Sequence, residues 1–218
     1  MADENSREVS AEPPKKSGLK LACLIVAIIG AAGMFVLVIL AILLFPALSA
    51  AREKARRTAC LNNLKCLSIA MESYTDDYNG YLPATLEMLA AERYAPPGVF
   101  YCPSRRESAK ARAAALAAFD EAARSGLNAQ ETAEAIRAAA PPHYVYVRYE
   151  TKKDAMGAPV LYDEAQNHED GRNVSFGDLH AEWLSEQDLA QRFEREAEQV
   201  PAFKEHLDKH GIDGAARR

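Results

Sequence analysis

Two histidines and an aspartate in the last quarter of the chain have side chains that suit metal binding: His168, Asp178 and His180. Two imidazoles and a carboxylate are typical ligands of Zn²⁺ and other transition ions. However, Asp178 and His180 fall in a predicted tight turn, where aspartate is favoured because it hydrogen-bonds to the nearby backbone. The spacing also matches no hydrolase motif such as H-E-x-x-H. We therefore predict a structural turn with no catalytic or metal-binding role, and metal binding by these three residues is the alternative.

A second set of oxygen ligands, Asp76, Asp77 and Asn79, could bind Ca²⁺. The stretch is far shorter than the roughly 12-residue EF-hand loop and lacks its closing glutamate. Asn79 is followed by Gly80, a strong signal for a helix end and a turn. We predict a helix-ending turn and no cofactor, with Ca²⁺ binding as the alternative.

The cysteines limit which disulfides can form. Cys60 and Cys66 are six residues apart on one predicted helix, hence roughly 9 Å apart along its axis, and they cannot pair. Cys23 lies in an apolar run, so the remaining candidate pair is Cys60 with Cys102. Such a bond would place the domain in an oxidising compartment. Unpaired thiols remain the alternative, because connectivity cannot be deduced from sequence.

The charge balance and the motifs exclude several functions. The net charge is −5, and a chain of this kind has no clustered basic footprint for nucleic acid. The sequence contains no phosphate loop, no nucleophile elbow and no Cys-x-x-Cys redox motif. We therefore expect no enzyme, no nucleic-acid partner and no small-molecule substrate.

One long helix, predicted over residues 21–78, must position these groups. Residues 21–51 contain no charged side chain, which exceeds the roughly 20 apolar residues that cross a bilayer. Beyond a charged segment, apolar residues recur at steps of four and three: Cys60, Leu64, Leu67, Met71, Tyr74 and Tyr78. That spacing places them on one helical stripe that packs against a domain.

We predict that the apolar run is a retained membrane anchor. It is longer than the roughly 7–15 apolar residues of a signal peptide, and no small-residue cleavage site stands at its end. The predicted organisation is a disordered cytoplasmic tail over 1–18, a transmembrane helix over 19–48 and an extracytoplasmic domain over 49–218. Basic residues precede and follow the span in similar numbers, so the positive-inside rule sets no orientation.

The extracytoplasmic part has mixed helix and strand patterns. An Ala-rich insertion at 105–140 predicts a helical hairpin, with Asn128 and Glu131 forming a capping box. Segments rich in β-branched and aromatic residues predict a small antiparallel sheet over 143–149, 159–163, 173–176 and 181–184. Helical patterning returns over the C-terminal tail, 185–218. The fold class is therefore α+β: a long N-terminal helix packed on the sheet, with the inserted hairpin and a C-terminal helix.

Several segments resemble type IV pilin-like proteins and type II secretion pseudopilins. The helix carries Ala50-Ala-Arg-Glu-Lys-Ala-Arg-Arg57, and the turn after it reads Asp77-Tyr-Asn-Gly-Tyr-Leu-Pro83. Nine residues separate His168 from Asp178, as in the pseudopilin-like family with the H-x9-DG signature. The family's Cys-Pro element is similar to Cys102-Pro103, and its paired cysteines match Cys60 and Cys102.

The resemblance implies a structural protein without catalytic activity, either a subunit or an accessory of a secretion or pilus-like apparatus. It implies the bacterial inner membrane, with the N-terminus in the cytoplasm and the domain in the periplasm. The implied partners are the lipid bilayer and other pilin-like subunits or secretion machinery. The alternative is a single-pass anchored binding or sensor domain that does not assemble, such as a metal-dependent one.

The sequence also departs from the family at two positions, Cys23 and Leu179. Gly18 and Leu19 form the candidate site for the family's leader peptidase, yet Cys23 stands where pilin-like proteins carry a glutamate. That carboxylate is the charge that could pair with the amino terminus of a neighbouring subunit, so we expect an uncleaved, stably anchored relative. Leu179 replaces the glycine of the signature, so the turn must be made differently.

Overall fold

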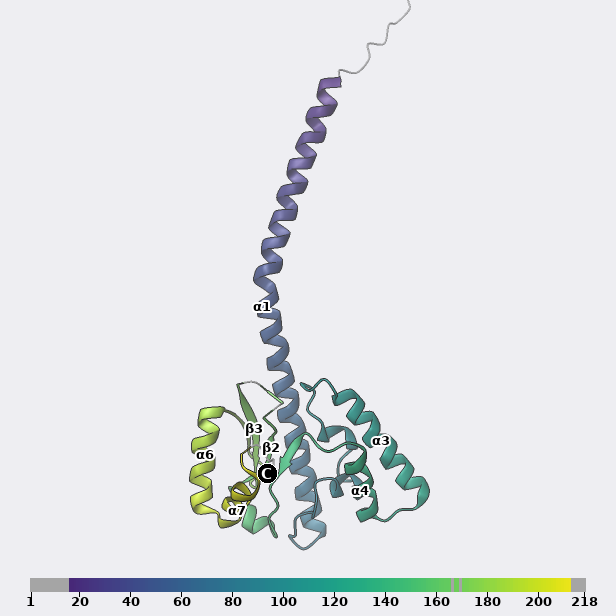
Figure 1. Cartoon of the computed structure of the whole chain (residues 1–218), viewed down its shortest axis with the longest axis vertical. Coiled ribbons are helices and arrows are strands. Elements are labelled where there is room, and N and C mark those ends of the chain that lie inside the picture. The colour runs from purple at the N-terminus through teal and green to yellow at the C-terminus, as the bar shows by residue number, and fades with distance from the viewer. Residues whose placement is uncertain (1–15, 166, 169, 213–218) are drawn as a thin grey trace, which may run out of the picture. The chain divides into compact units, whose positions relative to one another are not determined.

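The structure is a computed structural model that describes residues 16–165, 167–168 and 170–212. The chain divides into two compact units, Met1–Ala51 and Arg52–Arg218 (Figure 1). Most of the predicted tail, residues 1–15, lies outside the described residues. The backbone of residues 16–18 belongs to the first turn of helix α1, so the predicted boundary at residue 18 lies inside that helix.

Helix α1 (Lys16–Asp77) confirms the long helix predicted over 21–78, and it continues through Pro46. In the first unit its large apolar side chains are exposed, with Phe45 reaching 75% exposure. Apolar surface of this extent is unfavourable in water, at about 25 cal/mol per Å². Within the described ranges, α1 is the one helix long and apolar enough to cross a bilayer. It is therefore a candidate single-pass membrane anchor.

The part of α1 in the second unit carries the predicted stripe. Its first five positions are buried in the core: Cys60, Leu64, Leu67, Met71 and Tyr74. The prediction was wrong for the sixth position. Tyr78 is 38% exposed, and its ring stacks on the ring of Tyr74 at a centroid distance of 4.1 Å. Tyr78 follows the last helical residue, so the 3.6-residue period no longer sets its direction.

The predicted antiparallel sheet has four strands in the order β1-β2-β3-β4. Their bounds are β1 (Tyr144–Tyr146), β2 (Pro159–Asp163), β3 (Gly171–Phe176) and β4 (Ala181–Ser185). Leu161 pairs with Ser175, and Tyr162 pairs with Val174. Three residues of the strand predicted over 143–149 form β1, which pairs with β2 in the register Tyr144 with Asp163 to Tyr146 with Leu161.

Side-chain alternation gives the sheet two buried faces. Ser175 faces α1, where its Oγ lies 2.5 Å from Oγ of Ser68. Val174 and Phe176 take the opposite face, and Arg192 of α6 (Glu186–Gln199) lies over the Phe176 ring. Figure 1 shows α6 on one side of the strands and α1 on the other. Consequently every residue of β2 and β3 is buried.

The helical insertion forms as predicted. It consists of α3 (Ser108–Ser125) and α4 (Ala129–Ala139), which follow each other as a hairpin (Figure 1). Asn128 and Glu131 form the predicted capping box, and Gly126 closes α3 in the left-handed conformation. Arg137 of α4 donates two hydrogen bonds to the buried carboxylate of Glu87, at 2.7 and 2.8 Å, and so ties the hairpin to the core.

Shorter helices complete the second unit: α2 (Met88–Ala91), η1 (Pro97–Phe100), α5 (Lys152–Ala155) and α7 (Pro201–His210). Helix η1 is a single 3₁₀ turn with Pro97 at its start. The C-terminal part holds two helices, since Pro201 lacks the N–H that would continue α6 and begins α7 instead.

The hairpin between β3 and β4 shows how the turn is made without the signature's glycine. Leu179 adopts a positive φ of 69°, a conformation that favours glycine, and its side chain is 41% exposed. Asp178 stabilises this turn by accepting a hydrogen bond from the backbone N–H of His180 at 3.0 Å. Gly177 is required for space, because an added Cβ would lie 2.1 Å from the carbonyl oxygen of Ala155.

This strain predicts that Leu179→Gly is more stable than Leu179→Ala by about 0.5–1 kcal/mol. A left-handed L-residue costs about 1–2 kcal/mol, of which the entropy of glycine in the unfolded chain offsets about 0.5–1 kcal/mol. Equilibrium unfolding in urea of the full chain in detergent micelles measures the difference. Equal stability of the two variants would contradict the strain at this position, and Gly177→Ala serves as the control that destabilises.

Candidate functional site

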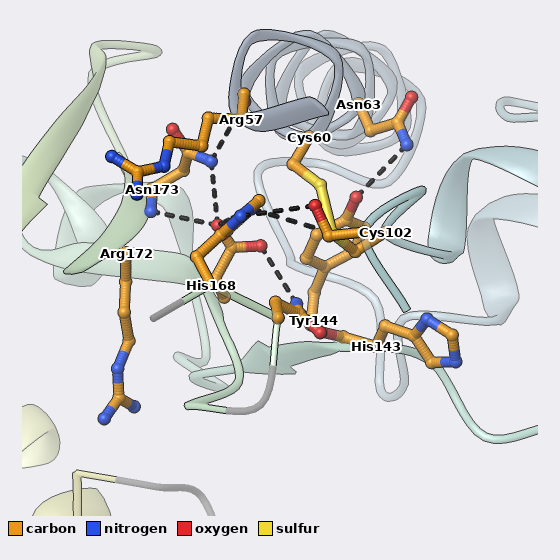
Figure 2. Close-up of polar contacts among 12 residues, drawn as sticks. Arg57, Cys60, Asn63, Cys102, His143, Tyr144, His168, Arg172 and Asn173 are labelled. Atoms are coloured by element: carbon orange, nitrogen blue, oxygen red, sulfur yellow. Dashed lines mark hydrogen bonds and ion pairs between the residues drawn. A yellow bond between two sulfur atoms is a disulfide. The ribbon is translucent and has the colours of Figure 1, made fainter. Parts of the chain in front are cut away.

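A buried cluster of sulfur, imidazole and carboxylate lies between α1 and the sheet. Cys60 of α1 forms the predicted disulfide with Cys102, which lies two residues after the end of η1. The side chains of His168 and Asp163 complete the cluster, and one donor atom from each of the four residues lies within 4.8 Å of the others. All four residues are buried. Figure 2 shows the ring of His168 beside the Cys60–Cys102 disulfide, next to α1.

Local structure explains how these residues meet. Cys60 is the first member of the buried stripe, so its side chain points into the core. Asp163 ends β2 two residues after Leu161 and therefore shares its face, the one toward α1. Asn173 of β3 lies on that face as well and bonds to Asp163. His168 comes from the β2–β3 loop, which returns the chain over the cluster.

The imidazole of His168 is oriented by one strong contact. Its Nδ1 lies 2.8 Å from Oε1 of Glu53 and 3.3 Å from Oγ of Ser104. Glutamate accepts when ionised, so Nδ1 carries a proton and donates it. The other nitrogen, Nε2, then faces Oδ2 of Asp163 at 3.5 Å and Sγ of Cys102 at 3.7 Å.

The carboxylate of Asp163 is held by amide donors. Its Oδ1 accepts from the side chain of Asn167 at 3.0 Å, and its Oδ2 accepts from the backbone N–H and the side chain of Asn173 at 3.0 and 2.8 Å. Burial raises the pKa of Asp163 above its ordinary value, while the charge of His168 and these hydrogen bonds oppose the rise. Each bond from an N–H donor favours the ionised form.

A cation closes the cluster from the loop side. The Arg57 guanidinium lies 2.7 Å from Asp170 and 4.4 Å above the ring of Trp183. The Trp183 ring in turn meets the edge of His168 at a centroid distance of 5.4 Å. Glu53 lies 3.7 Å from the same guanidinium. The β2–β3 loop is thus tied to α1 by the Arg57–Asp170 ion pair and the His168–Glu53 contact, and to β4 by the contact between the rings of His168 and Trp183.

Arg172 belongs to the other face of β3. Its guanidinium donates to Glu186 of α6 at 3.0 Å and to the carbonyl of Ile212 at 2.9 Å. Figure 2 shows the Arg172 side chain directed away from His168. The polar groups of the cluster are therefore those on the α1 face of the sheet.

The structure does not bring His168, Asp178 and His180 together, although all three lie in the described residues. His168 precedes β3, whereas Asp178 and His180 follow it, and six strand residues span roughly 20 Å. Asp178 is exposed in its turn, and His180 pairs with Glu182 at 3.7 Å. At the end of α1, Asp77 accepts a hydrogen bond from Tyr94 at 2.5 Å, Asp76 is exposed, and Asn79 takes a positive φ of 55° in the turn.

Sequence reasoning missed the partners that His168 has in the fold. The signature pairs His168 with Asp178, but the carboxylates beside it are Asp163 and Glu53. Two signals were present: Asp163 is an acidic residue at the end of an otherwise apolar strand, and Glu53 lies one helical turn before Arg57. Neither signal identifies the contact, because both depend on long-range packing.

The fold and the cluster define a class: an α+β protein with one candidate single-pass membrane anchor. A family model described as a protein of unknown function, DUF1559 (SBP_bac_10), matches residues 49–95, which are 47 of the 218 residues. That family is typical of pilin-like bacterial proteins. The matched segment covers the buried stripe of α1 and ends just after α2. No curated protein and no solved structure matches the chain.

We predict that the disulfide contributes about 3–4 kcal/mol to the stability of the second unit. The bond closes a loop with a sequence separation of 42 residues, and chain entropy for such a loop corresponds to about 4 kcal/mol. The double variant Cys60→Ala/Cys102→Ala should lose this amount in urea unfolding of the full chain in micelles. Cys66→Ala, which removes an exposed free thiol, should leave stability unchanged. A loss under about 1 kcal/mol in the double variant would contradict the prediction.

A buried histidine beside the cluster predicts acid sensitivity. Burial, followed by the positive charge of Arg105, lowers the pKa of His143 from 6.5 to about 4. Below pH 6.5 the unfolded chain binds a proton that the folded chain does not take up until about pH 4, so stability should fall as the pH falls through this window. His143→Phe keeps an aromatic ring against Tyr101 and removes this titration.

Urea unfolding over the same pH window measures the effect. His143→Phe should have a shallower slope of unfolding free energy against pH than the parent chain. His206, whose pKa is also lowered to about 4 by burial, accounts for part of the remaining slope, so a double variant with His206→Phe should be flatter still. Equal slopes for His143→Phe and the parent chain would contradict the prediction.

Proposed function

We propose that this protein is a membrane-anchored, pilin-like structural subunit or accessory of a secretion or pilus-like apparatus, acting through packing and not through catalysis. One observation carries the proposal. The first unit is a helix whose apolar side chains are exposed on all sides, and the same helix α1 supplies the buried stripe of the second unit. The family match over 49–95 supports it, because that family is typical of pilin-like proteins.

The physics of the first unit favours a lipid environment. About 20 helical residues span roughly 30 Å of hydrocarbon, and residues 21–51 carry no charge. Inside the bilayer the apolar side chains lose their unfavourable contact with water. A helix of this kind associates with other helices mainly by close packing of small residues, and Gly30 and Gly33 leave open space on this one.

The proposed location is the bacterial inner membrane, with the N-terminus in the cytoplasm and the second unit in the periplasm. The Cys60–Cys102 disulfide supports this orientation, since disulfides persist in oxidising compartments. Cys66 offers a direct test because it is an exposed free thiol of the second unit. With Cys23→Ser as background, a membrane-impermeant maleimide should label Cys66 in intact spheroplasts, and labelling only after lysis would overturn this orientation.

Assembly is tested by disulfide cross-linking within the membrane. In a Cys23→Ser/Cys66→Ser background, single cysteines are placed in turn at positions 26–32, and membranes are oxidised with copper phenanthroline. A packed helix should cross-link with a period of about 3.6 residues, either to a second copy or to a pilin-like partner. The parent background, whose two remaining cysteines are already bonded to each other, is the matched control.

A flat, background-level profile would overturn assembly and favour an anchored binding domain that works alone. The buried Cys–His–Asp cluster is the observation that favours this second candidate, because it is a built arrangement of chemically capable groups. The mass of the mature N-terminus separates the two further. A chain that begins at Leu19 has been processed as pilin-like subunits are, whereas a chain that begins at Met1 keeps its tail as a standing anchor.

A further inference from the structure

We propose that the buried cluster is a redox-gated metal site: when the Cys60–Cys102 disulfide is opened, Cys60, Cys102, His168 and Asp163 bind one Zn²⁺ ion. The inference concerns the second unit alone and does not depend on whether the protein assembles. Two thiolates, an imidazole and a carboxylate form a ligand set that suits Zn²⁺. Among the described residues, this is the one group of three or more such side chains that converges.

The positions of the donor atoms suit a tetrahedral ion. One donor atom of each residue lies within 4.8 Å of the other three. With Zn–S distances of about 2.3 Å and Zn–N or Zn–O distances near 2.0 Å, donor atoms on one ion lie about 3.2–3.8 Å apart. His168 Nε2 already lies 3.5 Å from Asp163 Oδ2 and 3.7 Å from Cys102 Sγ. The two sulfurs must separate by roughly 1.7 Å once their bond is broken.

The electrostatics of the cluster call for a cation at its centre. Because Nδ1 of His168 donates to Glu53, Nε2 is the ring nitrogen that faces the carboxylate of Asp163 and the sulfur of Cys102. Electron-rich atoms that face one another in a buried site repel unless a proton or a metal ion lies between them. Opening the disulfide adds two thiols that can ionise to thiolates, so a divalent ion then balances the charge better than a single proton.

The surroundings supply the outer contacts that metal sites use. A carboxylate that accepts the second N–H of a ligand histidine fixes the tautomer and the ring orientation, and Glu53 does this for His168. The amides of Asn167 and Asn173 hold the carboxylate of Asp163 in the same way. Glu53 is a positioning residue in this scheme, because it acts through His168 and does not touch the ion.

The gating step balances with a dithiol as reductant. The dithiol loses two S–H hydrogens and forms its own S–S bond, and its two electrons break the Cys60–Cys102 bond. The two protein sulfurs then bind Zn²⁺ as thiolates, so two protons are released to solvent in the overall step. In the reverse direction, oxidation of the thiolates to the disulfide removes two of the four ligands and releases the ion.

Cobalt is the spectroscopic probe for this site. The full chain with Cys23→Ser/Cys66→Ser, in detergent micelles, leaves Cys60 and Cys102 as the remaining thiols. It is reduced with a phosphine, desalted without oxygen and titrated with Co²⁺. We expect one equivalent of Co²⁺ to produce a near-ultraviolet thiolate-to-cobalt charge-transfer band and strong visible bands of a tetrahedral ion. One equivalent of Zn²⁺ should abolish both, and the oxidised chain should show neither.

Matched variants separate the site from simple thiol binding. His168→Gln and Asp163→Asn should each weaken Co²⁺ binding at least tenfold and shift the visible bands, because a ligand is lost. Glu53→Gln, at a partly exposed residue, should weaken binding about tenfold with the tetrahedral bands retained. The exposed turn variants Asp178→Asn and His180→Gln should bind as tightly as the parent chain.

Circular dichroism shows whether the reduced chain is folded, so that each result of the titration either supports or contradicts the proposal. If the reduced chain loses structure, Zn²⁺ should restore it, since the energy of metal binding is then coupled to folding. Absence of the charge-transfer band in a folded reduced chain overturns the proposal, and so does a reduced chain that stays unfolded with Zn²⁺. Parent-like affinity and spectra in both His168→Gln and Asp163→Asn would overturn it as well, because the cysteines alone would then hold the ion.

Discussion

The contact between the buried stripe of α1 and one face of the sheet is the interaction on which the second unit depends. Leu64, Leu67 and Met71 supply the apolar part of that contact and are at most 4% exposed. Strand alternation places the polar residues Asp163, Asn173 and Ser175 on the same face, so they enter the interface together with the apolar ones. An unpaired polar group in such a place costs about 1–3 kcal/mol, which is why each of these residues bonds to a partner on α1 or on the sheet.

The polar interface also gives the contact its register. A purely apolar helix could slide or rotate on a sheet with little loss of free energy. The hydrogen bonds between Ser68 and Ser175 and from Asn173 to the carbonyl of Arg57 fix α1 at two points along its length. The disulfide adds a covalent attachment of α1 to the segment after η1. Glu53 and Arg57 then hold the β2–β3 loop against the same helix. One helix thereby orients three separate parts of the chain.

The features that the sequence predicted well are those with a local physical cause. The apolar run, the stripe of α1 and the capping box at Asn128 each depend on residue types and spacing along a single helix. The disulfide could be proposed from the sequence because Cys60 and Cys66 cannot pair on one helix. The environment of His168 could not be predicted from the sequence. Asp163 and Glu53 lie 5 and 115 positions from it in the chain, and the packing of β2 and α1 brings them to it. The burial of Tyr78 was predicted wrongly because α1 ends at the residue before it, and helical periodicity no longer applies there.

The edges of the four-stranded sheet limit how two such domains can join. β1 offers only three residues at one edge, and β4 carries the charged Glu182 at the other. Short or charged border strands are poor templates for pairing with a neighbouring sheet. Backbone-to-backbone growth from copy to copy is thereby disfavoured. Any ordered association of this protein is left to side-chain surfaces, which can be tuned residue by residue.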